Sequence, residues 1–174
     1  MSTFKYYRDS YSPGLYQPPG RAPFTREVNI PGLIANGGLA NTLDVRTALP
    51  ATGFAAADIL QVFQVSLGFC LACVGARVKT AEGAAATATI GNNSATQTHL
   101  LAIDADGYMT SLNLNSATTQ ISPVTAAQLG PNTAAGVGNM GVVFVTNGSI
   151  DITFSSADTN AAIFDVFALG AMVF

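Results

Sequence analysis

The sequence predicts an all-β protein, with a β-sandwich or jelly-roll-like body that follows an extended N-terminal arm. About eight short runs of alternating or β-branched residues, with Gly, Asn and Thr in the connections between them, indicate the body. A sharp change of composition near residue 40 indicates the arm. We therefore divide the chain into an arm, residues 1–40, and a body, residues 41–174.

The arm is rich in proline, aromatic and basic residues. The first 31 residues hold four of the five Tyr, five of the eight Pro and four of the seven basic residues, against two acids. Prolines at this spacing prevent a long helix and remove hydrogen bonds that a central strand needs. Such a segment is either a low-complexity tail or a docking arm. We favour docking, because Tyr and Arg are enriched at the anchoring positions of protein interfaces.

The candidate partner-binding residues are large aromatic and basic side chains of the arm: Tyr6, Tyr7, Arg8, Tyr11, Tyr16, Arg21, Phe24 and Arg26. Thirty extended residues would reach about 100 Å at roughly 3.3 Å per residue, far beyond the radius of the body. We expect a chain that lacks residues 1–30 to keep a folded body but to lose its attachment to a partner.

Four runs in the first half of the body predict strands. Residues 42–49 alternate strictly between two faces, and residues 86–90 alternate Thr with Ala or Ile. Residues 59–66 and 69–78 are apolar and rich in β-branched side chains. A further pair, residues 99–103 and 108–114, flanks a hairpin-like turn signal at residues 104–107.

The strongest local signal lies near the C-terminus. Asn147-Gly148 separates the apolar residues 142–146 from the alternating residues 149–154, and Asn-Gly suits a type I′ turn, so a β-hairpin is expected. Residues 163–174 predict a strand pair or one long strand bent at Gly170.

Helix signals are few. Ser122-Pro123 and Gly130-Pro131 could begin and end one or two helical turns, and residues 52–58 could hold another single turn.

Composition excludes several classes of protein. Charged residues make up 10% of the chain, against about 25% in an average globular protein, so we expect other molecules to cover much of the surface. The net charge of −3 does not suit a nucleic-acid binder. The chain has no apolar run long enough for a transmembrane helix, and we expect no secretory signal, because the first residues are rich in Tyr and Pro. Two cysteines do not make a disulfide scaffold.

Sequence motifs do not point to catalysis. The G-x-G-x-x-G match at residues 136–141 leads into a strand, whereas a dinucleotide site needs a helix there. Cys70 and Cys73 are expected on opposite faces of a strand, as two small buried hydrophobes. Residues 104–107 lack the further ligands of a calcium loop, and the chain has one His. We therefore predict no enzyme, no catalytic residue, no cofactor and no metal.

Four segments of the body carry a resemblance to a known family: AADILQVFQV, GARVKTAEGAAATATIGN, GYMTSLNLN and SIDITFSSADTNAAIFDVFAL. In order and pattern they resemble the head decoration, or cement, proteins of tailed bacteriophages, small β-rich virion proteins encoded beside the major capsid protein. The resemblance covers about residues 55–170 and does not extend to the arm.

This resemblance implies a capsid decoration protein on the outer surface of the phage head. Its partners would be the major capsid protein and further copies of itself, commonly in trimers, with no nucleic acid and no membrane. Arms on one oligomer would reinforce one another, because later contacts form at high effective concentration. The alternative is a phage fibre or receptor-binding module that recognises a host surface ligand. A virion enzyme such as a depolymerase would need paired carboxylates in a cleft.

Overall fold

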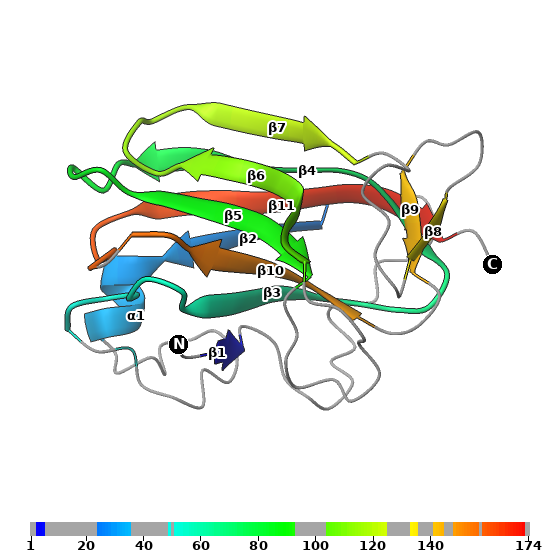
Figure 1. Ribbon diagram of the computed structural model, residues 1–174. Helices are drawn as coiled ribbons and strands as arrows, with labels where there is room; N and C mark the ends of the chain where they lie inside the picture. The colour runs from blue at the N-terminus through cyan, green and yellow to red at the C-terminus, as the bar shows by residue number, and fades with distance from the viewer. Residues whose placement is uncertain are drawn as a thin grey trace.

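The computed structural model describes residues 3–5, 24–35, 49, 51–92, 104–124, 133–135, 141–144, 148–156 and 158–172. These residues form two stacked β-sheets and one short helix (Figure 1). The strands are β1 (Thr3–Lys5), β2 (Phe24–Asn29), β3 (Ile59–Val65), β4 (Phe69–Thr80), β5 (Thr87–Asn92), β6 (Asp104–Asn113), β7 (Thr119–Pro123), β8 (Thr133–Ala135), β9 (Val142–Phe144), β10 (Gly148–Phe154) and β11 (Ile163–Met172). The helix is α1 (Ile30–Ala35).

The strands divide into two sheets. Sheet A has the order β1-β3-β10-β5-β6, and sheet B has the order β2-β11-β4-β9-β8, with β7 also paired to β4. All pairs are antiparallel except β1 with β3. An all-β sandwich is therefore confirmed.

The connectivity is that of a jelly roll. Leaving aside β1 and the small β8–β9 pair, the remaining eight strands pair from the outside inwards: β2 with β11, β3 with β10, β4 with β7, and β5 with β6. Successive pairs alternate between the two sheets, which is how a double-stranded ribbon folds when it is wound into a sandwich.

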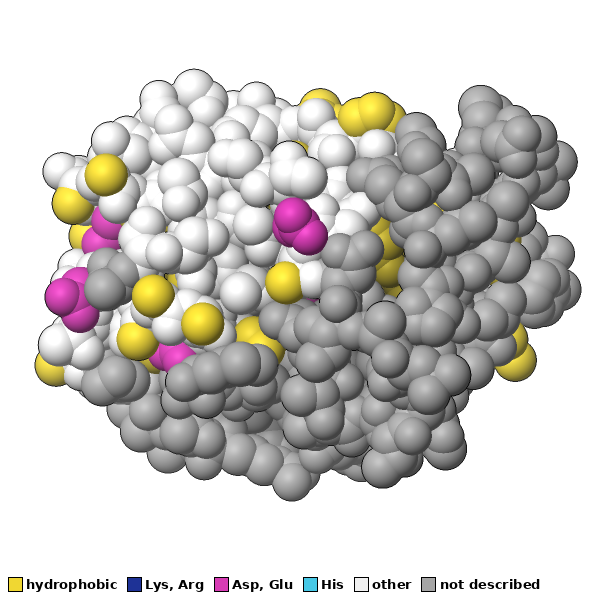
Figure 2. Space-filling view, viewed as in Figure 1, with side chains coloured by type: hydrophobic (Ala, Val, Ile, Leu, Met, Phe, Trp, Pro, Cys, Tyr) yellow, Lys and Arg dark blue, Asp and Glu magenta, His cyan; other side chains and the backbone are white. Residues whose placement is uncertain are grey.

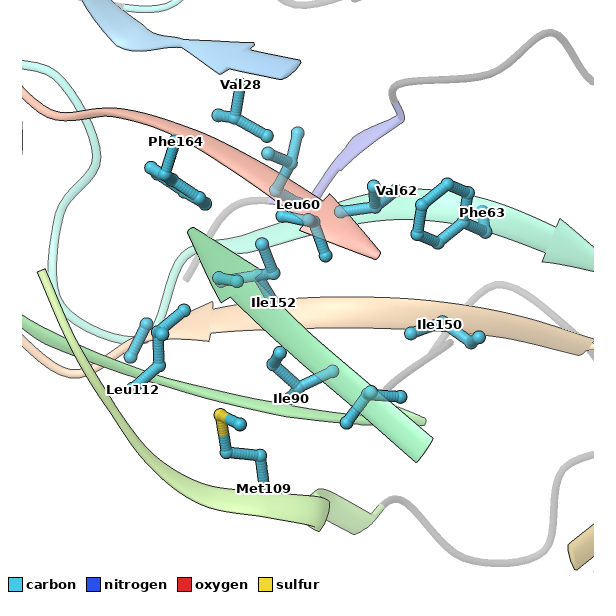
Figure 3. Packing of buried hydrophobic residues seen from close by; sticks show 14 of the residues in the cluster. Val28, Leu60, Val62, Phe63, Ile90, Met109, Leu112, Ile150, Ile152 and Phe164 are labelled. Carbon is cyan, nitrogen blue, oxygen red and sulfur yellow. The ribbon is translucent and has the colours of Figure 1, made fainter. Parts of the chain in front are cut away.

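The core lies between the inner faces of the two sheets (Figure 3). Ile152 of β10 is in register with Leu60 of β3 and Ile90 of β5, and all three side chains are fully buried. From sheet B, Phe164 of β11 is in register with Val28 of β2, and both are also fully buried. Each such side chain contributes about 1.5–3 kcal/mol of burial, so this layer dominates the stability of the fold.

The first strand of the jelly roll lies inside the segment predicted as the arm. β2 pairs with β11 over its whole length, and Val28, Ile30 and Leu33 enter the core. α1 follows directly, because the Asn29 side-chain oxygen accepts a hydrogen bond from the Gly32 amide at 2.8 Å and caps the first turn. The boundary at residue 40 is therefore wrong, because residues 24–35 belong to the body.

Residues 104–107 are not a hairpin turn. They belong to β6, where Asp104 is in register with Asn92 and Met109 with Ile90, so one residue of β5 faces four of β6. The Thr89 hydroxyl donates a hydrogen bond of 2.7 Å to the Ala105 carbonyl oxygen at this point. The acidic, Gly-containing signal marks a wide bulge inside one strand.

The predicted hairpin at Asn147-Gly148 is also wrong. β9 and β10 exist as strands, but β9 pairs with β4 and β8 in sheet B, whereas β10 lies between β3 and β5 in sheet A. Both hydrogen-bonding edges of β10 are occupied, so β9 cannot pair there. A two-residue turn preference is overruled by pairing across the whole sandwich.

The remaining local predictions are divided. β11 is a single strand with a register shift between Leu169 and Gly170, as one of the two alternatives expected. Ser122 and Pro123 lie in β7 and are therefore not a helix cap and first helical position, and Gly130-Pro131 lies outside the described residues. Residues 51–58 form turns with a bridge from Phe54 to Thr159. Residues 42–48, 99–103 and 136–140 lie outside the described residues.

One end of the sandwich is held together by a carboxylate. Glu82, between β4 and β5, accepts hydrogen bonds of 2.8–3.1 Å from the backbone amides of Asn160, Ala161 and Ala162. The Ala162 carbonyl in turn accepts a bond from the Ile30 amide at the start of α1. Glu82 therefore joins three segments that are far apart in the sequence.

We expect the Glu82→Ala substitution to lower the free energy of unfolding by about 1.5–3 kcal/mol, because it leaves three backbone amides without their acceptor. Urea unfolding followed by circular dichroism measures the change. The matched control is Asp106→Ala, which removes an exposed carboxylate and should cost less than about 0.5 kcal/mol. Equal effects of the two substitutions would contradict the role given to Glu82.

Deletions at the N-terminus distinguish the two boundaries. A chain without residues 1–30 loses the buried Val28 and Ile30 side chains, so its free energy of unfolding should fall by roughly 3–6 kcal/mol. A chain without residues 1–23 keeps β2 and should unfold cooperatively near the full-length midpoint. Urea titrations of both chains test this. Equal stability of the two chains would show that residues 24–30 belong to the arm and not to the body.

Candidate docking surface

The outer face of sheet A is polar and uncharged over much of its described area. Figure 2 shows this side of the molecule, where the coloured part consists mostly of white atoms, which belong to the backbone and to uncharged polar side chains, and the acidic groups are isolated. Exposed residues here include Thr87 of β5 and Thr110, Ser111 and Asn113 of β6. The face offers hydroxyl and amide groups with little charge.

The outer face of sheet B has a different character at each end. At one end, three successive rows across the sheet contain no charged residue. We call the outward residues that β11, β4 and β7 contribute to these rows the apolar face: Phe167, Leu169 and Ala171 of β11, Cys70, Cys73 and Gly75 of β4, and Ile121 and Pro123 of β7. Ile121 is 63% exposed and Leu169 40% exposed, which is unusual for large aliphatic side chains.

The central strand of the apolar face has a glycine, Gly75, in the row that it shares with Phe167 and Ile121. A Cβ atom placed on Gly75 would lie 2.5 Å from Cζ of Phe167 and 2.4 Å from the Gln120 carbonyl oxygen. The Phe167 ring therefore lies across β4 at this position, in space that any larger residue would occupy. Gln120 also ties β7 to β6, accepting a hydrogen bond of 2.8 Å from the Asn113 amide and donating one of 2.7 Å to its carbonyl.

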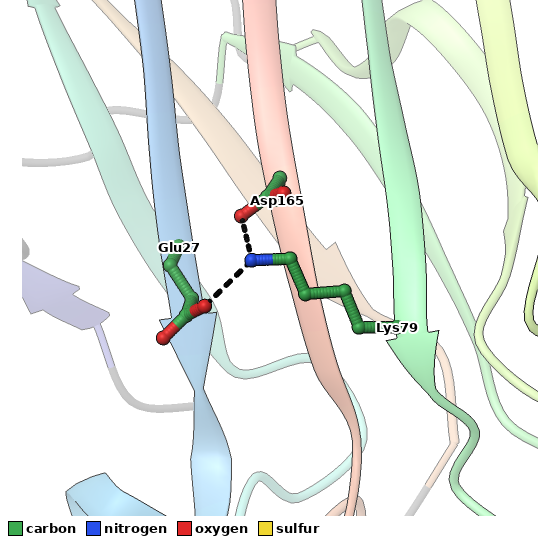
Figure 4. Close-up of polar contacts among 3 residues, drawn as sticks. All are labelled: Glu27, Lys79 and Asp165. Atoms are coloured by element: carbon green, nitrogen blue, oxygen red, sulfur yellow. Dashed lines mark hydrogen bonds and ion pairs between the residues drawn. The ribbon is translucent and has the colours of Figure 1, made fainter.

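The other end of the face carries an ion cluster (Figure 4). Lys79 of β4 contacts Glu27 of β2 at 2.6 Å and Asp165 of β11 at 2.7 Å. Glu27 and Asp165 are direct neighbours in the ladder, so Lys79 separates two like charges. Its hydrogen bonds, first to Asp165 and then to Glu27, raise the pKa of Lys79 above its ordinary value of 10.5.

The two cysteines share one face. A register shift places Cys73 opposite Leu169 and Leu71 opposite Gly170, which leaves Ala72 as an extra residue in β4. Because of this bulge, Cys70 and Cys73 both point outwards and are half-buried, contrary to the expectation of opposite faces and full burial. Both are thiols, and burial raises the pKa of Cys70.

Of the predicted partner-binding residues, the structure describes two. Phe24 and Arg26 lie in β2, in register with Ala168 and Val166, so they belong to the edge of sheet B and not to an extended arm. The other six lie outside the described residues: Tyr6, Tyr7, Arg8, Tyr11, Tyr16 and Arg21. The apolar face was not found from the sequence, since its residues come from three strands whose pairing no local pattern reveals.

Among the described residues, no three His, Cys, Asp or Glu side chains gather where a metal ion could be held. Asp151 is a fully buried carboxylate in β10, in register with Gln61 of β3 and Gly91 of β5. Within the same described ranges, none of the helical segments has the length and hydropathy of a bilayer crossing.

Comparison of the chain with protein-family models, with curated proteins and with solved structures finds no match.

The raised pKa of Lys79 predicts a pH-dependent contribution to stability. A lysine whose pKa is higher in the folded state stabilises the fold fully below its ordinary pKa of 10.5, and the contribution disappears as the pH rises through the folded value. We expect the difference in urea midpoint between the wild type and Lys79→Met to be constant from neutral pH to about pH 10 and to shrink above it.

The titration of tyrosines does not affect this difference in urea midpoint, because the wild type and the variant contain the same tyrosines. Lys79→Arg is the second control, because its guanidinium stays charged throughout this pH range and should keep its advantage over Lys79→Met. A wild-type difference that persists unchanged beyond pH 12 would contradict the assignment.

Proposed function

We propose that the protein is a structural subunit of a virus particle: a capsid decoration, or cement, protein on the outer surface of a tailed-phage head. It would bind the major capsid protein lattice and further copies of itself, and its work would be binding across capsomer seams without chemical conversion. The observation that carries this proposal is the pairing of a rigid jelly roll with two broad outer faces that present little net charge.

Low charge on both faces favours contact with other proteins over a solitary existence. With 17 charged residues in 174, several of them already engaged in holding the fold, few remain to keep the surface hydrated. Removing water from uncharged surface costs less free energy than removing it from charged surface, so such faces suit a tightly packed shell. Jelly rolls occur in viral capsid proteins and also in lectins, so the fold by itself does not choose between roles.

The resemblance to decoration proteins falls on the sheets. Its four segments coincide with β3, the β4–β5 region, β6 and the β10–β11 region. These elements build most of both outer faces. The likeness therefore concerns the part of the chain that would meet the shell, which supports the proposal.

The means of attachment needs revision from the sequence-based prediction. β2 is the first jelly-roll strand and cannot leave the body without exposing Val28, and β1 pairs in parallel with β3. An arm of 40 residues that reaches about 100 Å is therefore replaced by a shorter leader, upstream of Phe24, that acts together with the faces of the body. The aromatic and basic residues from Tyr6 to Arg21 remain the proposed leader contacts.

The test uses heads of the phage that encodes the chain, stripped of decoration proteins. Fluorescently labelled full-length chain should bind them with saturable occupancy, and the chain without residues 1–23 should bind at least about tenfold more weakly. A chain with residues 6–23 in scrambled order is the matched control for length and composition. It should also bind weakly if the order of the aromatic and basic residues matters.

Two results would overturn the proposal. The first is no saturable binding of the full chain to stripped heads. The second is full occupancy by the chain without residues 1–23 together with unchanged binding when the exposed faces are altered.

The second candidate is a fibre or receptor-binding module. The uncharged polar outer face of sheet A favours it, because hydroxyl and amide groups can hydrogen-bond to sugars. The sequence has no Trp, and aromatic stacking platforms are what such sites usually employ. Binding of the isolated chain to a glycan array or to host cells, without binding to heads, would select this function.

A further inference from the structure

We propose that the apolar face of sheet B is a contact between two copies of this chain. The inference deepens the proposed function, on which its biological setting rests, by naming the surface through which copies meet. The face consists of Phe167, Leu169, Ala171, Cys70, Cys73, Gly75, Ile121 and Pro123.

The apolar face includes exposed large apolar residues. Across the described residues, four large hydrophobic side chains are exposed, and two of them, Ile121 and Leu169, lie in the apolar face. The other two are Leu67, in the turn between β3 and β4, and Met172, which is in register with the buried Phe69 and so points to the other side of sheet B. Contiguous apolar surface of this kind marks an interaction site more often than scattered single residues do.

Charge favours a second copy as the occupant. The charged end of the same sheet face carries Glu27 and Asp165 against Lys79 and Arg77, which sum to zero. A neutral face has no electrostatic preference for an acidic or a basic partner. A second copy meets the requirement that apolar surface face apolar surface, and it brings no net charge to the contact.

An antiparallel arrangement of the two copies covers the apolar end of the face and leaves the charged end in water. If the twofold axis passes near the row of Leu169, Cys73 and Pro123, apolar rows cover apolar rows. The ion clusters of the two copies then lie at opposite ends, in water, and no charge is buried. A parallel overlap would place Lys79 and its partners inside the contact. This twofold contact gives a dimer, whereas the resemblance implies trimers.

The size of the face sets the strength of the contact. Three rows about 7 Å apart on three strands about 4.8 Å apart cover roughly 300 Å², against about 800 Å² per partner in a standard stable interface. The dimer should therefore be weak in dilute solution, with a Kd of about 10 µM to 1 mM. On a particle, several such contacts would act together.

Sedimentation velocity of the purified full-length chain, from about 5 µM to about 1 mM, tests the contact. The wild type should shift from monomer to dimer across this range. Leu169→Lys and, separately, Ile121→Lys should weaken dimerisation by at least about tenfold, because each places a charge in the apolar face. The matched control is Leu67→Lys, an exposed leucine off the face, which should dimerise like the wild type.

The native cysteines supply a second readout. Cys70 and Cys73 lie within the face, so their reaction with a maleimide should slow as the wild-type concentration rises but stay constant in Leu169→Lys. Circular dichroism and thermal midpoints confirm that each variant is folded. Both readouts are made without particles, so they are separate from the test of decoration.

The proposal is overturned if the wild type stays monomeric at about 1 mM, or if Leu169→Lys and Leu67→Lys associate equally well. If the chain binds heads but does not self-associate, the decoration function stands and this contact is refuted. If the chain forms dimers that depend on Leu169 but does not bind heads, the contact stands and the decoration function is refuted.

Discussion

The pairing of β2 with β11 is the constraint on which the rest of the structure depends. It joins residues near the start of the chain to residues near its end, and it forms the outermost of the four nested strand pairs. Val28 and Phe164 meet in this pair and are fully buried, so the pairing also completes the core. Because β11 is held between β2 and β4, it can carry both the ion cluster and part of the apolar face. Such non-local pairing is expected to make folding slow.

Irregular positions in the ladders decide which side chains reach the surface. The bulge at Ala72 turns both cysteines outwards, and the bulge in β6 absorbs an acidic turn signal into a continuous strand. A third shift, between Ile150 and Asp151, accompanies a strand that is buried on both sides at the centre of sheet A. One extra residue reverses the alternation of every position after it, so a few bulges determine the chemistry of whole faces.

Several of the few charged residues stabilise loops and sheet edges in this fold. Glu82 binds three backbone amides, the Asp58 carboxylate accepts a bond from the Ala55 amide, and Lys79 bridges Glu27 and Asp165. These groups hold loops and sheet edges in place. The outer faces, by contrast, are left polar and uncharged on sheet A and partly apolar on sheet B. Such a distribution suits a building block whose surfaces are shared with neighbours.

The sequence by itself determined the fold class, the strands β3, β4, β5, β10 and β11, and the scarcity of charge, because alternation and composition are local or additive properties of a chain. Only the tertiary structure decided that β2 belongs to the body, that β9 and β10 lie in different sheets, and that Leu169, Cys73 and Ile121 form one face. These outcomes depend on which distant strands compete for the same hydrogen-bonding edge. A local pattern, including a strong Asn-Gly turn signal, contains no information about that competition.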